Sequence, residues 1–267
     1  MATSSTKKHF PALEDIREAL QKASLIAFMA WSDVRARYKR SVLGPFWLTL
    51  GTAVGTVGLG FIWSELFKID RSIFIPTLTS GLIIWQFIAG CITEAPTAFT
   101  RQAAIIRNLV LPLSIHPIQL VVKHLINLLH NLPVFFVVSI VFNVNFTYYS
   151  LLVVPCLLLV VANLLWITLM LGLLGARLRD LEYLVMAIMP ILMFLSPVMY
   201  RPNYLPFSQK LMWLNPFSHL IEIVRAPLLG MPPSLFVVCI NLAICVLGWL
   251  VALVFFSKKK TRVALWV

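Results

Sequence analysis

Four basic residues immediately before a long apolar stretch constrain this chain more than any other feature of its sequence. Arg35, Arg37, Lys39 and Arg40 precede the apolar segment 43–67. A basic cluster resists transfer across a bilayer and marks the cytoplasmic side of a membrane span. As a helix the segment would rise about 37 Å, which exceeds the roughly 30 Å hydrocarbon core. We therefore expect the chain to enter the membrane here from the cytoplasm, with a tilted first span.

The composition agrees with an integral membrane protein. Hydrophobic residues make up 60% of the 267 residues and charged residues 12%, whereas soluble domains have about 45–50% and about 25%. The formal net charge is +12, but the cations lie beside apolar stretches, where the positive-inside rule explains them without nucleic acid. The four cysteines lack the spacing of a metal site or a disulfide framework, so we expect neither.

Five further apolar stretches follow the first. The six predicted spans cover about 43–67, 73–93, 118–141, 150–174, 183–199 and 234–256. The segments that would then lie in the cytoplasm hold sixteen Lys and Arg residues and those outside hold five, with Lys123 inside a span. This asymmetry predicts a multi-pass protein of the plasma membrane with both termini in the cytoplasm.

Three segments are not predicted to cross the membrane. Residues 1–42 combine a polar tail with an apolar stripe that includes Leu13 and Leu20, which predicts an N-terminal interfacial amphipathic helix or a solvent-facing helix on a partner. Residues 200–233 are interrupted by prolines and predict re-entrant or interfacial helices on the outer face. Residues 258–267 form a basic-aromatic cytoplasmic tail. The expected fold is an all-α integral membrane domain over 43–257 with six transmembrane helices.

Catalytic motifs are missing from the sequence. It contains no P-loop, no His-Glu-x-x-His, no Gly-x-Ser-x-Gly and no acidic cluster that would hold magnesium on a diphosphate. We therefore expect no enzyme activity, no metal and no cofactor on this chain, and any ATP would be hydrolysed by another polypeptide. His124 and His130 lie singly in the third span. A structural role is favoured at each because a polar group in a span usually bonds a neighbouring helix.

Several short motifs occur along nearly the whole chain. They are 37–47 (RYKRSVLGPFW), 111–114 (LPLS), 175–180 (GARLRD), 214–217 (LNPF) and the tail 262–267 (RVALWV). In these motifs the chain resembles the ABC-2 type (type V) exporter permeases, and among them the transmembrane subunits that export O-antigen, capsular polysaccharide or teichoic acid on a lipid carrier. The motif 37–47 is the most specific, and Leu265 stands where an aromatic residue is frequent in that family.

The resemblance implies partners and a cargo. The chain would form a homodimer in the bacterial inner membrane and pair with two copies of a separate ABC ATPase subunit, which would bind ATP and magnesium. The cargo would be an undecaprenyl-diphosphate-linked polysaccharide. Export of a small lipid or drug by the same fold stays open, as does a membrane enzyme acting on polyprenyl-linked sugars.

The resemblance also implies roles for two cytoplasmic sets of residues. A coupling helix at about 98–110 would seat in the ATPase, and its candidate contacts are Phe99, Arg101, Arg107 and Asn108. The basic cluster Arg35, Arg37, Lys39 and Arg40 would bind the lipid diphosphate, because guanidinium groups suit phosphate oxygens. In both sets the cations also satisfy the positive-inside rule, and the basic cluster could simply anchor to anionic lipid.

The glycan path and its outer gate would be aromatic, because rings give weak, repeated contacts to sliding sugar rings. The channel candidates are Phe46, Trp47, Phe61, Trp63, Phe67 and Phe194. The gate candidates lie at 200–233 and are Tyr200, Tyr204, Trp213, Glu222 and Arg225. Ordinary interfacial placement explains single Trp and Tyr residues equally well, and Glu222 and Arg225 are spaced to form a local pair.

Overall fold

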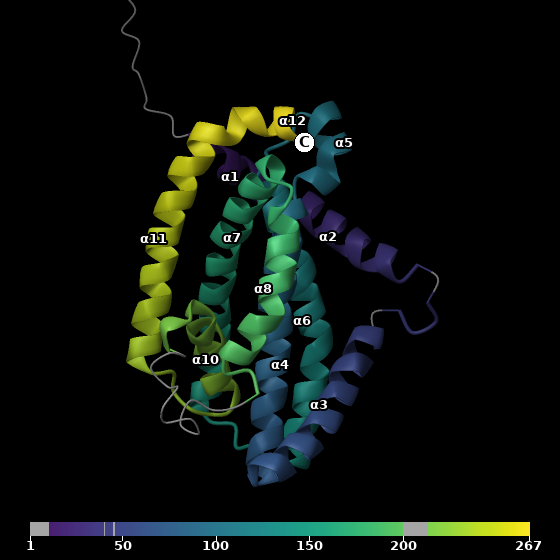
Figure 1. The fold of residues 1–267 in the computed structure, drawn as a ribbon, viewed down its shortest axis with the longest axis vertical. Helices are drawn as coiled ribbons and strands as arrows, with labels where there is room; N and C mark the ends of the chain where they lie inside the picture. Colours follow the sequence, from purple (N-terminus) through teal and green to yellow (C-terminus); the bar gives the residue numbers. More distant parts are fainter. Residues whose placement is uncertain (1–10, 40, 45, 200–212) are drawn as a thin grey trace, which may run out of the picture.

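The computed structural model describes residues 11–39, 41–44, 46–199 and 213–267, and within these ranges the chain is helical without a strand. Among the described residues, five helices are long and apolar enough to cross a membrane. They are α3 (Phe46–Phe67), α4 (Arg71–Glu94), α6 (Ile115–Val141), α7 (Val153–Arg177) and α11 (Leu235–Lys259). Figure 1 shows these helices running along the long axis of the molecule.

The sixth predicted span corresponds to a shorter helix. Helix α8 (Leu181–Leu195) has 15 residues, so it rises about 22 Å. It is apolar but lacks the length of the other five. The sixth span therefore stays a prediction, whereas the other five lie within a few residues of their predicted positions.

Helix α4 forms the centre of the bundle. Most of its residues are buried, because it packs against α3, α6, α7, α8 and α10 (Pro216–Leu228). Helix α3 instead buries one stripe at a spacing of four residues, which consists of Thr52, Thr56, Gly60 and Ser64. Small side chains at this spacing allow two helices to approach closely. The rest of α3 is left as an apolar outer face.

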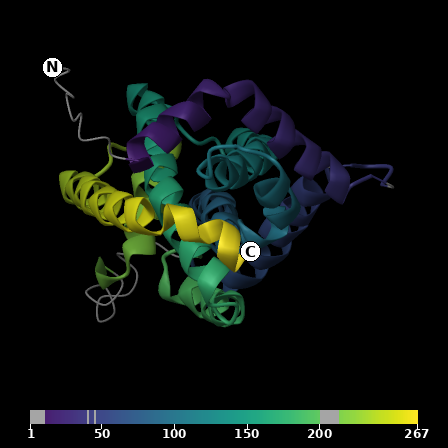
Figure 2. The same cartoon turned by 90° about the horizontal axis from the view of Figure 1, so that it is seen from above.

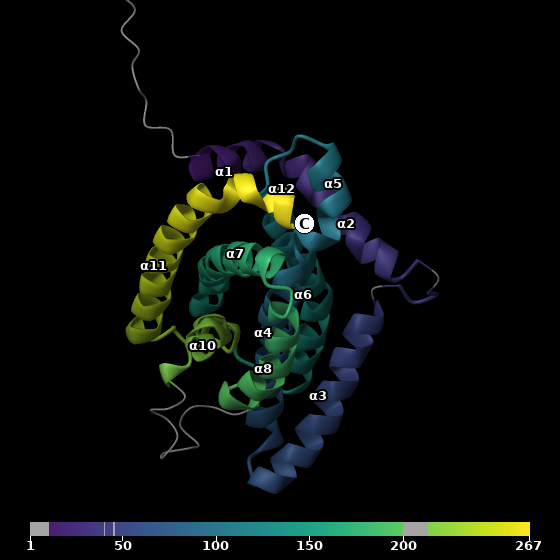
Figure 3. The same cartoon turned by 45° about the horizontal axis from the view of Figure 1, so that its top comes forward.

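Two N-terminal helices cross one end of the bundle. Helices α1 (Pro11–Gln21) and α2 (Ala23–Arg37) lie across it, with α12 (Val263–Trp266) beside them (Figures 2 and 3). Sequence reasoning predicted a single interfacial helix, whereas the chain breaks at Lys22 between two. The stripe residues Leu13 and Leu20 are more than half exposed, which suits an interfacial position. We call this end of the bundle the α5 end.

The segment between α4 and α6 is also at the α5 end. It consists of η1 (Ala95–Thr97), η2 (Thr100–Gln102) and α5 (Ala103–Asn108), and we call residues 95–110 the coupling segment. At Gly175 of α7 a Cβ atom would overlap the carbonyl oxygen of Pro96. Glycine at this position therefore allows α7 and the coupling segment to touch through their backbones.

Helix α10 and η3 (Tyr148–Leu152) lie near the opposite end, which we call the α10 end. Asn215 caps α10 by accepting a hydrogen bond from the backbone N–H of Phe217 at 3.0 Å, and Pro216 occupies the first turn. Both are common signals for a helix start. Thr147 donates to the carbonyl oxygen of Gly230 and so joins the α6–α7 turn to the end of α10.

Candidate transport and coupling sites

One carboxylate at the α5 end collects basic groups from three elements. Glu94 accepts Arg37 of α2 at 3.1 Å and Arg101 of the coupling segment at 2.9 Å. It also pairs with Lys123 of α6 and lies 3.3 Å from Nε2 of His124. Opposite charges this close attract strongly where little water is present. Glu94 therefore joins α2, α4, the coupling segment and α6, a role that the sequence analysis did not assign.

A second missed carboxylate lies in α1. Asp15 is 1% exposed and accepts hydrogen bonds from the backbone N–H groups of Leu113 and Ser114 and from the Ser114 hydroxyl. Lys260 pairs with it at 2.8 Å. Such bonding offsets the cost of burying a charge. Asp15 thus fastens α1 to the motif 111–114 and to the C-terminal segment.

The predicted coupling residues have different surroundings. Phe99 is wholly buried and packs edge-on against His116, so it anchors the segment within this chain, and its contact with an ATPase stays a prediction. Arg101 is engaged by Glu94. Arg107 donates to the carbonyl oxygen of Val267, and Asn108 donates to that of Ala104.

Two apolar residues of the coupling segment are exposed and were not singled out from sequence. Leu109 is 56% exposed and Val110 is fully exposed. They follow α5 directly, before the chain turns into α6. Exposed apolar side chains at a tip can dock on another protein. A search for apolar residues among the charged ones at 98–110 would have found them.

The basic cluster divides between two places. Arg35 and Lys39 line a cavity of about 560 Å³ together with aromatic side chains and small residues, namely Phe28, Trp31, Ser32, Ala36, Tyr38 and Gly44. Arg37 turns away toward Glu94, and Arg40 lies outside the described residues. The expected four-cation set is therefore not a single site in the part of the chain that the structure describes.

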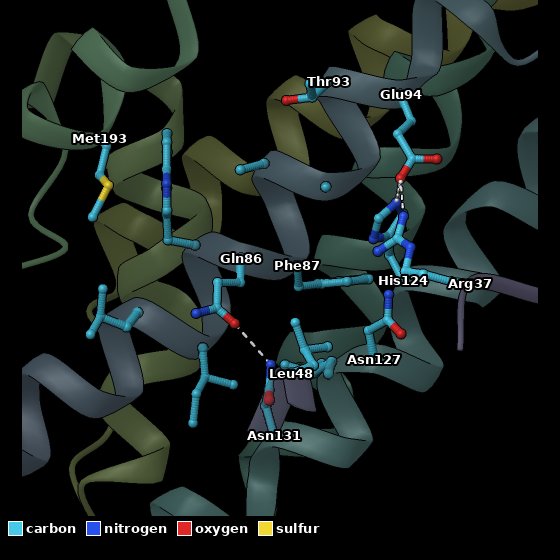
Figure 4. A pocket seen from close by; sticks show the side chains of 16 residues that line it. Arg37, Leu48, Gln86, Phe87, Thr93, Glu94, His124, Asn127, Asn131 and Met193 are labelled. Atoms are coloured by element: carbon cyan, nitrogen blue, oxygen red, sulfur yellow. Dashed lines mark hydrogen bonds and ion pairs between the residues drawn. The ribbon is translucent and has the colours of Figure 1, made fainter. Parts of the chain in front are cut away.

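A separate cavity of about 540 Å³ lies between α3, α4, α6 and α8 (Figure 4). Its polar lining comes from Gln86 of α4 and from Asn127 and Asn131 of α6, with Arg37 and Glu94 at the α5 end. The Asn131 amide donates to Gln86 at 2.8 Å. The predicted channel residues are all aromatic, so these polar residues were not among them.

The predicted channel aromatics are mostly on the outside of the chain. Phe46, Trp47, Phe61, Phe67 and Phe194 are between 43% and 64% exposed, and Trp63 is partly buried, with its ring 5.1 Å from that of Phe67. These surfaces would contact lipid or another copy of the chain. Their role in a channel stays a prediction.

The gate candidates that the structure describes lie in α10 or just before it. Arg225 is 1% exposed and donates to Glu222 and to the carbonyl oxygen of Pro197 after α8. The local pair expected from the spacing of Glu222 and Arg225 is therefore formed, and the arginine in it is buried. Trp213 lies 5.1 Å from the His219 ring. Tyr200 and Tyr204 lie outside the described residues.

Both histidines of the third span contact other groups of the chain. His124 faces Glu94, and His130 bonds the carbonyl oxygen of Ile126 and stacks on Trp31. Among the described residues no three His, Cys, Asp or Glu side chains are grouped to hold a metal ion.

Comparisons with known proteins agree with this architecture. Two proteins of Klebsiella pneumoniae, each named O-antigen export system permease protein RfbA, are 23% and 25% identical to this chain, covering 75% of it and 77% of each relative. A protein of the same name from Myxococcus xanthus is 22% identical, covering 69% of this chain and 71% of the relative. The ABC-2 type transporter family model matches residues 24–229. The chain therefore belongs to the ABC-2 type transporter family.

Proposed function

We propose that the chain is the transmembrane permease subunit of an ATP-driven exporter that moves lipid-linked polysaccharide of the O-antigen or capsule type across the bacterial inner membrane. The observation that carries this proposal is the similarity to three permeases named for O-antigen export, over more than two thirds of both chains. The five long apolar helices supply a membrane domain. No specific observation favours export of a small lipid or drug, or an enzyme of polyprenyl-linked sugars.

A separate ATPase supplies the energy in this proposal. The sequence contains no P-loop, so ATP has to act through a partner subunit. The coupling segment is the natural contact, because Leu109 and Val110 present apolar surface at its tip and Arg101 and Glu94 link it to α2 and α6. Both termini would then lie in the cytoplasm together with this segment.

The permease acts as a homodimer in this proposal. The outer face of α3 is apolar, and within the single chain no atom lies within 4 Å of a Cβ placed at Gly51, Gly55 or Gly58. Small residues at this spacing suit a close approach between membrane helices. Two copies facing each other through α3 and α8 would enclose the exposed aromatics Phe46, Trp47 and Phe194.

The cavity beside Arg35 and Lys39 would receive the lipid diphosphate first. It combines two cations with Trp31 and Tyr38, which together favour an anionic head at a membrane interface. Anchoring to ordinary anionic lipid uses the same chemistry. A competition between the two lipids for the purified chain separates these roles.

Co-purification with the candidate ATPase tests the function. The tagged chain should recover the ATPase, and ATP hydrolysis in lipid should rise with the lipid-linked glycan. Leu109→Glu with Val110→Glu should abolish recovery by placing charge on the apolar tip. Leu265→Glu, an equally drastic change at an exposed leucine of α12, should not. A chain that recovers no ATPase, or a complex that exports nothing, would overturn the proposal.

A further inference from the structure

The cavity of Figure 4 contains more hydrogen-bonding capacity than the protein itself uses. Gln86 accepts hydrogen bonds from Asn131 and from Thr52 through its oxygen, at 2.8 and 3.1 Å. Its amide nitrogen, and both polar atoms of Asn127, bond nothing in the part of the chain that the structure describes. Amides at membrane depth are costly unless they find partners. A ligand with hydroxyl groups would supply those partners.

The wall that holds these amides is fixed by the protein. Asn131 is 2% exposed and is held by its bond to Gln86, while Leu48 and Met193 supply apolar surface from α3 and α8. A volume of about 540 Å³ lies within the roughly 300–1,000 Å³ of small-ligand sites. Mostly apolar walls with a few placed polar groups are typical of such sites.

The end of the cavity nearest α5 is positively charged. Arg37, Arg101 and Lys123 converge on the single carboxylate of Glu94, so the group carries an excess of positive charge. Half of the Arg37 side chain is exposed, which leaves guanidinium N–H groups available to an anion. Guanidinium groups bind phosphate oxygens in a bidentate manner.

The spacing between the two parts limits the ligand. His124, beside Glu94, and Asn131 are separated by seven positions on α6, which corresponds to about 10 Å along the helix. A phosphate joined to one or two sugar rings has this length, with an anionic end and a hydroxyl-rich end.

We infer that the cavity binds the sugar next to the diphosphate of a lipid-linked glycan, with the sugar hydroxyls on Gln86 and Asn127 and a phosphate on Arg37. This inference rests on the proposed function and extends it, since it gives the permease a contact with the first sugar of its cargo. A phospholipid headgroup offers related chemistry, namely a phosphate and a few hydroxyl groups, and the test separates the two.

The test measures binding to the full chain in phosphatidylcholine nanodiscs, with two probes that differ by one sugar. The probes are a labelled polyprenyl diphosphate and the same lipid carrying a single sugar. The wild-type chain should bind the sugar-bearing probe more tightly. Asn127→Leu and Gln86→Leu should each reduce that preference about three- to tenfold, the effect of one hydrogen bond, and leave the sugar-free probe unchanged. Arg37→Gln should weaken both probes.

Asn127→Leu is the decisive variant, because Asn127 is only half-buried and bonds no described residue, so the variant should fold. Asn145→Leu, at an exposed position of the α6–α7 turn, is the matched control and should bind as wild type. Equal binding of the two probes, or an unchanged preference in Asn127→Leu, would overturn the inference. Displacement of the sugar-bearing probe by an equal concentration of phosphatidylglycerol would assign the cavity to lipid headgroups instead. Binding needs no ATPase, so failure here is distinct from failure of the complex to assemble.

Discussion

The Arg107 side chain in α5 donates through Nε to the backbone carbonyl oxygen of Val267 at 3.0 Å. Val263 and Val267 are buried in the same apolar cluster as Phe99 and Phe256. The tail of residues 260–267 therefore closes over the coupling segment from the side of α11. Movement of the coupling segment would have to move this tail, so the two act as one unit.

Replacing Arg107 should loosen that unit. In Arg107→Gln the tail loses a charged hydrogen-bond donor, and such bonds contribute about 1.5–3 kcal/mol. We expect amide hydrogen exchange in 260–267 to become at least tenfold faster, while α7 is unaffected. Arg177→Gln removes an exposed cation from the end of α7 and serves as the control. Unchanged exchange of the tail in Arg107→Gln would contradict this role.

Removing the charge of Glu94 should destabilise the bundle. Lys123 is buried and would be left without its carboxylate, and breaking a buried pair costs about 3–5 kcal/mol. Glu94 is itself slightly exposed, so we expect the lower end of that range for Glu94→Gln in thermal or denaturant unfolding. Adding Lys123→Met should restore part of the loss. Glu65→Gln, which breaks the exposed pair with Arg71, should have little effect.

The spans were predictable from sequence because their signal is local. A bilayer requires about 20 apolar residues in a row, and the basic segments between them orient the chain. Helix α8 is the exception, because apolar residues beyond Leu195 continue without helix. Hydropathy reports which residues avoid water and does not report where a helix ends.

The side-chain contacts at the α5 end were not predictable in the same way. Asp15 accepts a hydrogen bond from Ser114, which is 99 positions away. Arg107 was predicted only as a contact for the ATPase, and its bond to Val267 across 160 positions was not expected. Charge patterns identify cations and anions on the same side of a membrane but do not pair them. The paired residues are far apart in the sequence and meet only when the helices pack, so no local pattern predicts them.

The start of α4 should respond to pH through Asp70. The backbone N–H of Ser72 donates to its carboxylate at 2.8 Å and holds the pKa of Asp70 below its ordinary value. A lowered pKa in the folded state stabilises the fold at pH values above the unfolded pKa of about 3.9 and loses this effect as pH falls through the folded pKa. Asp70→Ala should therefore melt earlier than wild type near neutral pH, and the difference should shrink below about pH 4.

Asp70→Ser is the matched variant for that measurement. Serine keeps an oxygen that accepts the Ser72 N–H but carries no titratable charge. The difference in melting temperature between Asp70→Ser and Asp70→Ala should therefore be the same near neutral pH and below about pH 4. If the melting temperatures of wild type and Asp70→Ala differed equally at neutral and at acidic pH, the carboxylate would be ruled out as the source of the stabilisation.

Two glycines of similar helical setting should respond oppositely to alanine. At Gly175 an added Cβ would overlap the carbonyl oxygen of Pro96, whereas at Gly51 nothing lies within 4 Å. Backbone cannot move aside as a flexible side chain can, so Gly175→Ala should push the coupling segment away from α7 and cost about 1–3 kcal/mol, as overpacking typically does. Gly51→Ala should instead leave the stability of the single chain unchanged or raise it slightly, because alanine is the better helix former. Thermal unfolding of the purified chain measures both. Equal stabilities for the two alanine variants would contradict the backbone contact at Gly175. A lower dimer fraction of Gly51→Ala in cross-linking would locate the contact between copies on α3.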